Sequence, residues 1–368
     1  MKMVWISTGV ILMLAAAVLA GFMYLKSKSS GDPESVIDYV QEHKGTENMA
    51  MVIRHNDEDW VSINKDMPLP LASTVKIIVA IEYARQAAEG KIDPQQKVDL
   101  KTLENYYVPN TDGGAHEAWI NSLTDDAENV PLSEVANGMI AYSSNANTDY
   151  LLKVLGIENV NKLSDDLQLS SHEEVYPIVS ALFIPMELME DKGLSKEEAL
   201  KELKSMSLEE YRKRGRKIHQ KWESNPPQEQ DKEEVLKVLD MEFQKVWSDR
   251  LPRASAGDYA ELMKLLNSKS YFSKEVHSYL DPGMEQLMKN PRNQEWLQHA
   301  GQKSGSTAFV FTISMYAADK EGNRTEMAFL ANDLSDREIK ELSRNMNSFQ
   351  LEFMTNSEFR DSVKEKLH

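Results

Sequence analysis

Apolar and polar positions along the chain predict strands at its two ends and helices between them. Residues 49–53 and 59–63 are apolar-rich runs separated by the polar segment 55–58, a pattern typical of a β-hairpin. Residues 307–318 and 325–331 repeat this pattern around the polar segment 319–323, which predicts a second hairpin. Most of the remaining chain has helical periodicity. The predicted helices include residues 35–42, 72–90, 133–152, 255–266 and 335 to the end.

This order of elements predicts an α/β (α+β) fold rather than a pure helical bundle. An antiparallel sheet built from both chain ends, 34–72 and 300–368, would be flanked by helices and joined to an all-helical subdomain, 73–299. Within that subdomain, residues 194–250 form a heavily charged helical stretch that is broken at Pro226-Pro227. Small-molecule sites commonly form in clefts between two such parts, so we expect the functional site there.

The N-terminal segment predicts a membrane anchor. Residues 3–25 contain no charged side chain, and about 20 apolar residues suffice to cross a bilayer as a helix. We therefore expect an anchor or signal segment at 1–28 and a polar linker at 29–33, followed by one folded domain at 34–368. Val18-Leu19-Ala20 before Gly21 is also typical of a signal-peptidase site, and cleavage there would release a secreted protein.

Composition excludes several kinds of chemistry. Hydrophobic residues make up 41% and charged residues 27% of the chain, the balance of a folded globular domain. The net charge of -17 disfavours binding to nucleic-acid phosphates. The absence of cysteine excludes disulfides, thiolate metal sites and thiol nucleophiles. The eight histidines show no metal-ligand spacing, so we expect neither a metal nor another cofactor.

Ser73 and Lys76 are the first candidate catalytic pair. They lie three residues apart at the start of a predicted helix, so their side chains share one face. A serine needs a base to become a nucleophile at neutral pH, and a lysine can serve if burial lowers its pKa. Ser62 and Lys65 have the same spacing, but they fall in a predicted hairpin, where residues three apart point to opposite faces.

Two further segments add groups of the same chemistry. Ser143-Ser144-Asn145 interrupts a helical stretch and offers a hydroxyl that can relay a proton and an amide that can bind a carbonyl. Lys303-Ser304-Gly305 is expected to begin a strand, where a cation, a hydroxyl and a bare backbone edge can bind a carboxylate. Taken alone, each segment is typical of an ordinary turn.

Together, Ser-x-x-Lys, Ser-x-Asn and Lys-Ser-Gly in this order resemble the three motifs of the class A β-lactamase and penicillin-binding-protein superfamily. The resemblance covers roughly residues 45–170 and 250–335 and implies a β-lactamase-like fold with the charged helices 194–250 as an insertion. It implies a serine nucleophile, a lysine as its general base, a second serine as a proton relay, and residues that bind the substrate. It implies no cofactor. The implied catalytic residues are Ser73, Lys76, Ser143 and Lys303, and the implied substrate-binding residues are Asn145, Ser304, Gly305 and Ser306.

The resemblance also assigns finer roles. Asn145 would bind the amide of the acyl side chain, while Lys303 and Ser304 would hold the substrate carboxylate and lower the pKa of the neighbouring lysine. The backbone N–H groups of Ser73 and Ser306 would form the oxyanion hole, where each donor is typically worth about 3–4 kcal/mol.

Besides the inserted helices, two features depart from the class A pattern. Ser144 stands where an aspartate is usual, and the Glu-x-x-Leu-Asn loop that supplies the deacylating glutamate is missing. The corresponding residues 170–177 offer His172, Glu173 and Glu174, either as substitutes or as a solvated loop. The basic run 211–217 is either a solvated face or a contact for an anionic polymer or lipid headgroups.

Two functional hypotheses remain open from the sequence. The first is a membrane-anchored, single-pass extracytoplasmic serine hydrolase that forms an acyl-enzyme through Ser73. Its substrate would be a β-lactam, a peptidoglycan-like D-amino-acid peptide, or a related amide or ester. The second is a catalytically weak or inactive binding or scaffold protein of the cell envelope that keeps the same fold.

Overall fold

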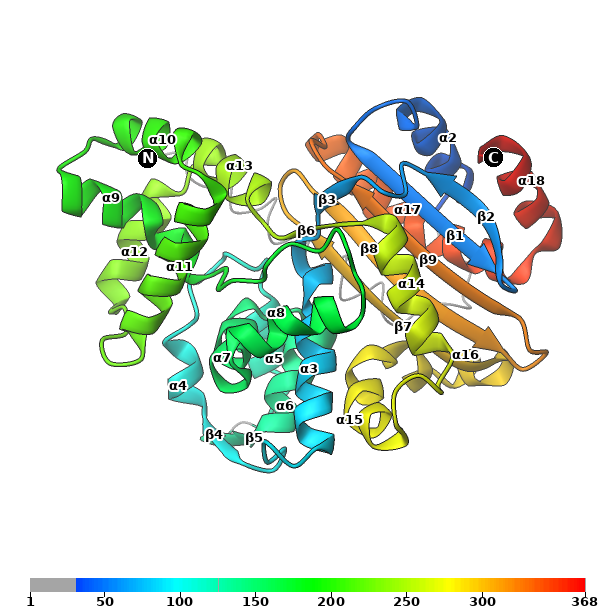
Figure 1. Cartoon of the computed structure of the whole chain (residues 1–368), viewed down its shortest axis with the longest axis horizontal. Helices are drawn as coiled ribbons and strands as arrows, with labels where there is room; N and C mark the ends of the chain where they lie inside the picture. The colour runs from blue at the N-terminus through cyan, green and yellow to red at the C-terminus, as the bar shows by residue number, and fades with distance from the viewer. Residues whose placement is uncertain (1–30, 125, 368) are drawn as a thin grey trace.

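A five-stranded antiparallel sheet joins the two ends of the chain (Figure 1). The computed structural model describes residues 31–124 and 126–367. The strand order is β2-β1-β9-β8-β7, so β1 from the N-terminal hairpin pairs with β9 from the C-terminal part. This arrangement confirms the sheet expected from the sequence. Its strands are β1 (Met49–His55), β2 (Glu58–Ile63), β7 (Leu297–Ser306), β8 (Phe311–Asp319) and β9 (Arg324–Ala331).

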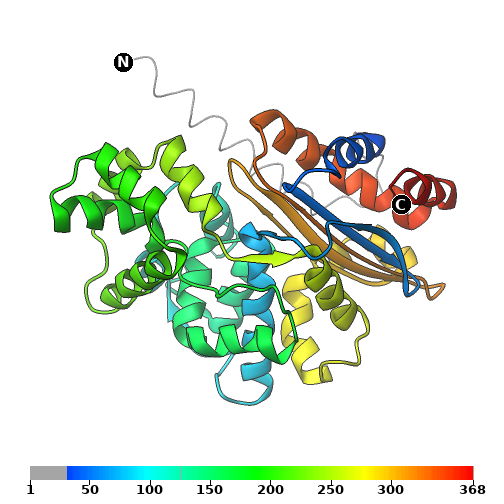
Figure 2. The same cartoon turned by 45° about the horizontal axis from the view of Figure 1, so that its top comes forward.

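Helices cover both faces of this sheet (Figures 1 and 2). One face packs against α2 (Glu34–His43), α17 (Asp336–Thr355) and α18 (Ser357–Leu367). The opposite face packs against α14 (Ala256–Asn267). Alternate residues of β1 point to opposite faces of the sheet. Met51 belongs to the hydrophobic cluster formed with α2, α17 and α18, and Val52 belongs to the cluster that includes α14. Because helices cover both faces, strands β8 and β9 are buried almost throughout, including polar residues such as Thr312 and Glu326.

The helical region is built around α3 (Lys76–Ala88), which is buried along nearly its whole length. Strand β4 (Lys97–Asp99) pairs with β5 (Asn129–Pro131) inside this region, and β6 (Arg253–Ser255) pairs with β3 (Pro68–Pro70), which precedes the region. The region is therefore mostly helical rather than all-helical. Its other elements are η1 (Ala72–Val75), α4 (Leu100–Glu104), α5 (Ala115–Ile120), α6 (Leu132–Asn137), η2 (Gly138–Tyr142), α7 (Asn145–Leu155), α8 (Ile157–Asp166), α15 (Lys274–Met284), η4 (Gln286–Lys289) and α16 (Pro291–Trp296).

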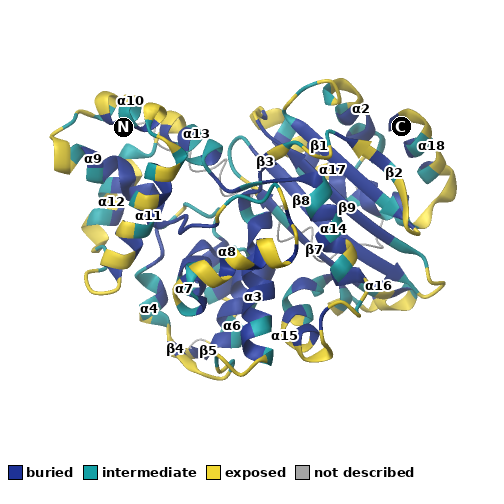
Figure 3. Cartoon of the chain, in the orientation of Figure 1, coloured by how far each residue is buried: buried dark blue, intermediate teal, exposed yellow. Residues whose placement is uncertain are grey.

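The charged stretch folds into a separate group of helices beside this region (Figures 1 and 3). The stretch itself contains α10 (Lys196–Ser205), α11 (Leu208–Trp222), α12 (Glu229–Val238) and α13 (Met241–Asp249), and the group also includes the preceding η3 (Ser180–Phe183) and α9 (Ile184–Lys192). Their outer faces are exposed and their inner faces are buried. The inner faces share a hydrophobic cluster with Tyr176 and Ile178, which lie in the loop leading into these helices.

The structure corrects the expected boundaries of one strand pair. Lys303-Ser304-Gly305 lies near the end of β7 rather than at the start of a strand, and residues 307–310 form the turn into β8. The N–H of Thr307 donates to the carbonyl of Val310 at 3.0 Å and closes this turn. The first half of β7 contains polar residues that find partners inside the protein. His299, for example, contacts the Asn267 side chain at 2.8 Å, so an apolar pattern did not reveal the strand.

The expected membrane anchor at residues 3–25 lies outside the described residues. Within 31–124 and 126–367, none of the helices combines the length and the hydrophobicity that a bilayer crossing requires. The expected division into an anchor, a linker and one folded domain stays a prediction.

Candidate active site

Ser73 lies on a short 3₁₀ turn, η1, that leads directly into the buried helix α3. Its side chain is half-buried, whereas Thr74 and Val75 beside it are buried. The preceding residue, Ala72, has a φ of +45°, in the left-handed region that non-glycine residues seldom adopt. Such strained backbone persists only where its surroundings enforce it, and it is concentrated at functional sites.

Lys76 is fully buried one turn after Ser73. Its Nζ donates to the carbonyl oxygen of Ser143 at 2.5 Å and to Oδ1 of Asn145 at 2.7 Å, with Oγ of Ser143 at 3.4 Å. Among the described residues, no hydrogen bond joins this Nζ to Ser73 Oγ. Burial lowers the pKa of Lys76 to about 7, against an opposing effect of Asp112 and Asp149, so a large neutral fraction is present at neutral pH.

The Ser143–Asn145 turn joins two helices at the point where it meets Lys76. Ser143 follows η2 with a φ of +77°, and Asn145 begins α7. Ser144 is buried and caps α7, because its Oγ accepts the N–H of Asn147 at 3.1 Å. This turn therefore places the hydroxyl of Ser143 and the amide of Asn145 on one side, while Ser144 has a structural role.

Lys303 reaches the same turn from the sheet. It is fully buried on β7, and its Nζ donates to Ser143 Oγ at 3.0 Å and to the carbonyl of Ser304 at 2.7 Å. Burial and repulsion by Lys76 lower the pKa of Lys303 well below its ordinary value. Two buried amines thus converge on one hydroxyl, an arrangement suited to moving a proton.

Gly305 brings the edge of β7 against the nucleophile turn. A Cβ atom at this position would lie 2.4 Å from the backbone nitrogen of Ser73 and 2.8 Å from that of Thr74, so only glycine fits. Thr312 on β8 ties the two segments together, since its Oγ1 lies 2.7 Å from Oγ1 of Thr74 and donates to the carbonyl of Leu71 at 2.8 Å. Ser304 is half-buried and Ser306 is exposed, so this strand edge remains open to a ligand.

The structure thus brings together the three segments that the sequence singled out. Ser143 and Asn145 contact Lys76, Lys303 contacts Ser143, and Gly305 packs on the Ser73 backbone. Ser304 and Ser306 flank Gly305 on the same strand. The catalytic and binding roles that the family resemblance gives to these residues stay predictions.

Two carboxylates near Lys76 escaped the sequence analysis. Asp149 is fully buried on α7, one turn after Asn145, and accepts the backbone N–H groups of Ile178, Val179 and Ser180 at 3.0, 3.0 and 3.2 Å. Burial raises its pKa to about 7. Its spacing of four residues from Asn145 on one helix is the only signal that the sequence offered.

Asp112 is the second of these carboxylates and lies in the loop before α5. Its Oδ2 accepts the backbone N–H of Asn145 at 3.3 Å. Burial also raises the pKa of Asp112, against the opposing effect of Lys76. Asp112 had no signal in the sequence, since it belongs to no motif.

The three side chains considered as substitutes for the deacylating glutamate all have other partners. His172 is neutral because burial lowers its pKa to about 4, and its ring nitrogens contact the carbonyl of Glu173 at 2.8 Å and the hydroxyl of Tyr259 at 3.2 Å. Glu173 accepts from Arg212 at 2.6 Å, and the exposed Glu174 accepts from Arg216 at 3.2 Å. None of the three is paired with the Ser143 turn or with the two buried lysines.

These contacts also give partners inside the protein to arginines of the basic run 211–217, whereas Lys213 and Lys217 are exposed. Arg212 is buried and pairs with Glu173, while Arg214 pairs with Glu187 at 2.8 Å. Neither a solvated face nor a site for an anionic polymer describes these arginines. The run attaches α11 to the loop and helix that precede it, and the loop in turn is held by Asp149.

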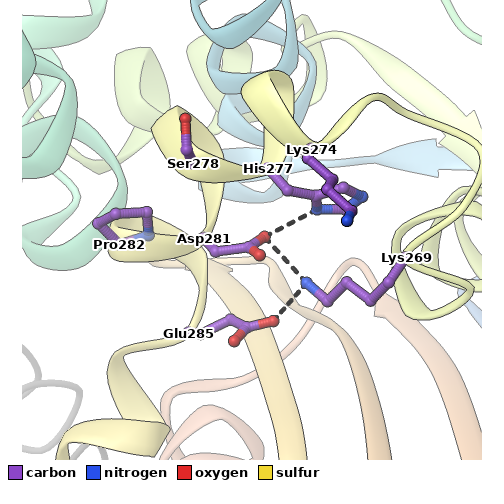
Figure 4. A pocket seen from close by; sticks show the side chains of 7 residues that line it. All are labelled: Lys269, Lys274, His277, Ser278, Asp281, Pro282 and Glu285. Atoms are coloured by element: carbon purple, nitrogen blue, oxygen red, sulfur yellow. Dashed lines mark hydrogen bonds and ion pairs between the residues drawn. The ribbon is translucent and has the colours of Figure 1, made fainter.

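A hollow of about 620 Å³ lies apart from the three motifs, beside α15 (Figure 4). Four of the side chains that line it contact one another, because Lys269 bridges Asp281 at 2.9 Å and Glu285 at 2.5 Å, and His277 contacts Asp281 at 3.1 Å. Tyr316 on β8 donates to Glu285 at 3.1 Å. This network fastens α15 to the sheet and contains none of the motif residues.

Comparison with known proteins agrees with this geometry. A sequence model of the β-lactamase enzyme family matches residues 33–294. The chain is 23% identical over 129 residues to β-lactamase VEB-1 of Pseudomonas aeruginosa, an alignment that covers 33% of this chain and 41% of that enzyme.

Solved structures show the same fold along nearly the whole chain. A class A β-lactamase from Bacteroides cellulosilyticus has a TM-score of 0.53 at 14% identity, covering 91% of this chain and 96% of that one. The chromosome-encoded β-lactamase of Vibrio parahaemolyticus has a TM-score of 0.54 at 12% identity, covering 89% of this chain and 100% of that one. The chain belongs to the β-lactamase enzyme family and has the β-lactamase fold.

Proposed function

We propose that the chain is a serine acyl-transfer enzyme that forms an acyl-enzyme through Ser73. Its substrate is a β-lactam, a D-amino-acid peptide of the peptidoglycan type, or a related amide or ester. The observation that carries this proposal is the convergence of two fully buried lysines on Ser143, beside the turn that holds Ser73. A protein that only binds has no need to bury two amines around a serine site, because their desolvation is costly.

The acylation step follows from the groups at hand. Neutral Lys76 takes the proton of Ser73 Oγ, either directly or through a bound water, as this oxygen attacks the substrate carbonyl carbon. The backbone N–H groups of Ser73 and Ser306 stabilise the oxyanion. Ser143 then passes its proton to the leaving nitrogen or oxygen as the bond to the carbonyl carbon breaks, and the proton held by Lys76 or Lys303 replaces it.

Release of the acyl group is expected to be slow. Hydrolysis of the ester needs a base that activates water, and Glu173 is occupied by Arg212 while His172 has both ring nitrogens in contact with other groups. Asp149 accepts three backbone N–H groups and is fully buried, which removes it from contact with bulk water. A persistent acyl-enzyme of this kind suits a peptidase, a transpeptidase or a slow esterase better than an efficient β-lactamase.

The test is intact-mass analysis of the purified full chain after mixing with a penicillin, with Ser73→Ala as the control. We expect a long-lived adduct of one penicillin on the wild type and none on the variant. Rapid drug consumption without an adduct would contradict slow release and indicate an efficient β-lactamase. If neither adduct nor consumption is seen, and a fluorophosphonate probe also fails to label Ser73, the alternative of an inactive cell-envelope binding or scaffold protein replaces this proposal.

We also propose that residues 3–25 anchor the protein in a membrane with the catalytic domain outside the cytoplasm, where peptidoglycan-like substrates lie. The uncharged length of this segment supports the proposal. When the full chain is expressed in a bacterial host with an outer membrane, we expect to find it in the membrane fraction. Added protease should cleave the domain once the outer membrane is permeabilised, while the inner membrane is intact. Recovery of a soluble form beginning at Gly21 would instead indicate a cleaved signal segment.

A further inference from the structure

Asp112 is a partly buried carboxylate that contacts the second motif without belonging to it. Its Oδ1 accepts the backbone N–H of Ala115 at 3.1 Å, and its Oδ2 accepts the backbone N–H of His116 at 3.2 Å. The same Oδ2 also accepts the backbone N–H of Asn145 at 3.3 Å. One side chain therefore fixes both the start of α5 and the first residue of α7.

Asn145 links this carboxylate to the buried lysine. Its backbone N–H is bound by Asp112, and its side-chain Oδ1 accepts from Lys76 Nζ at 2.7 Å. Asp112 is thus connected to Lys76 through a single residue. A negative charge on Asp112 raises the pKa of Lys76, and a positive charge on Lys76 lowers the pKa of Asp112, each against the larger effect of burial.

The charged groups around this pair come from several elements. Lys76 faces Lys303 from β7, Asp149 from α7 and Asp112 from the loop before α5. Asp112 faces Lys76 and His116. Of the two carboxylates, Asp149 is taken up by the three backbone N–H groups of residues 178–180, whereas Asp112 contacts the turn that holds Lys76.

The turn itself carries no charge that could replace Asp112. Ser144, its middle residue, is neutral and buried, and its hydroxyl is occupied by the N–H of Asn147 at 3.1 Å and by Nδ1 of His116 at 2.9 Å. The negative charge beside this turn therefore comes from a neighbouring loop and not from the turn.

We propose that Asp112 is a positioning residue for the acylation reaction, holding the main chain of Asn145 and placing a negative charge opposite Lys76. This inference rests on the proposed function of Ser73 and Lys76. Asp112 acts through Asn145 and through the electrostatic field at Lys76, and it does not touch the reacting atoms. Without its charge, the ammonium form of Lys76 loses an attractive partner while Lys303 continues to repel it.

The test compares wild type with Asp112→Asn in the full chain. The asparagine side chain has the same shape as that of aspartate and keeps one acceptor oxygen. The substitution therefore removes the negative charge with little change in volume. The rate of Ser73 labelling by a fluorescent penicillin is measured from pH 5 to pH 9. We expect the maximal rate to fall by about tenfold or more, because the Asn145 turn is less well held. We also expect the acidic limb of the pH–rate profile, where the labelling rate rises with pH, to move to lower pH. The reason is that Lys76 loses its proton more easily in the variant.

Asp99→Asn is the matched control. Asp99 also accepts a backbone N–H, that of Lys101 at 2.9 Å, but it is exposed and caps α4 away from the site. This variant should keep both the rate and the position of the limb. A fall in rate for Asp112→Asn without any movement of the limb would show a purely structural cap and overturn the proposal, as would an unchanged profile.

A second measurement separates this proposal from the proposed function. Nuclear magnetic resonance of lysine labelled with ¹³C at Cε follows the titration of Lys76 directly, with the signal assigned by its absence in Lys76→Met. Asp112→Asn should lower the midpoint of this titration even if no probe labels Ser73. If the midpoint does not change, the positioning role fails, whatever the labelling of wild type shows about catalysis.

Discussion

Lys76 and Lys303 donate to the same hydroxyl, that of Ser143, at 3.4 and 3.0 Å, although one lies on helix α3 and the other on strand β7. Both side chains are fully buried, so the site cannot comfortably hold two positive charges at once. Burial lowers the pKa of each lysine, and repulsion by Lys76 lowers that of Lys303 further. We therefore expect at most one of the two amines to be protonated at neutral pH.

This arrangement predicts how acylation depends on pH. Lys76 must be neutral to accept the proton of Ser73, and burial lowers its pKa to about 7. The rate of Ser73 labelling should therefore rise as the pH increases through about 7 and then level off. Lys76→Arg, whose guanidinium stays protonated, should lower the rate by roughly a hundredfold or more at pH 8. Lys91→Arg at an exposed position is the control, and a pH-independent rate in wild type would contradict the role of Lys76.

The same burial predicts a pH-dependent cost in stability. Lys76 has a folded-state pKa of about 7 against an ordinary value of 10.5, so the unfolded chain binds more protons between these pH values. Stability from this group therefore increases as pH rises from about 7 to 10, and the full penalty remains at lower pH. Lys76→Met removes the penalty, on the order of 5 kcal/mol. The difference in melting temperature between Lys76→Met and wild type should be largest at or below pH 7. This difference should decrease toward pH 10.

The sequence could predict which three segments meet, because each motif has a fixed local spacing. Ser73 and Lys76 are separated by one helical turn, and the Ser143–Asn145 segment interrupts a helical pattern at a visible polar break. Their convergence also requires β7 to pack on η1. This contact is possible because Gly305 has no side chain. The glycine of the Lys-Ser-Gly motif was visible in the sequence, but the segment against which it packs was not.

The sequence could not reveal groups that act through backbone atoms. Asp112 and Asp149 bind N–H groups of segments distant in the chain, and no side-chain pattern marks such contacts. Neither alternative that the sequence offered for the basic run, a solvated face or a contact for an anionic partner, describes Arg212, because its partner Glu173 lies on a loop whose position depends on the tertiary fold. Local charge patterns predict neighbours along a helix, but they do not predict partners across an interface.

Gly305→Ala should disable the site with a moderate loss of stability. The added Cβ would lie 2.4 Å from the Ser73 nitrogen and 2.8 Å from Thr312 Oγ1, so β7 or η1 must shift. We expect labelling of Ser73 to fall by roughly a hundredfold, since small displacements of reacting groups are costly, and stability to fall by about 1–3 kcal/mol. Gly45→Ala, which has no neighbour within 4 Å, is the control for both measurements. Normal labelling by Gly305→Ala would contradict the tight contact.

The lifetime of the acyl-enzyme should not depend on Glu174. This residue is exposed and pairs with Arg216, away from the two buried lysines. Glu174→Gln should therefore leave the rate of adduct loss within about twofold of wild type, because no general base has been removed. Time-resolved intact-mass analysis provides the rate. A much longer lifetime in the variant would identify Glu174 as the base that activates water and would contradict the proposed slow, unassisted release.

The Arg212–Glu173 pair should anchor the charged helices to the loop beneath the site. Arg212 is 9% exposed, and its Nη2 lies 2.6 Å from Glu173 Oε2. Glu173 also accepts the backbone N–H of Arg253 at 3.2 Å, so the pair connects α11 to β6 as well. Arg212→Met leaves Glu173 without its cation, and we expect a loss of about 2 kcal/mol in the free energy of unfolding, reduced from the fully buried case because Glu173 is partly exposed.

A double-mutant cycle with Glu173→Gln isolates the interaction, measured by urea unfolding of the full chain. The matched control is the cycle for Arg216 and Glu174, which lie 3.2 Å apart on the same two segments but are more exposed. Its coupling energy should be below about 1 kcal/mol, as is usual for surface pairs. Equal coupling energies in the two cycles would show that the basic run behaves as a surface and that α11 is held to the loop by its apolar face alone.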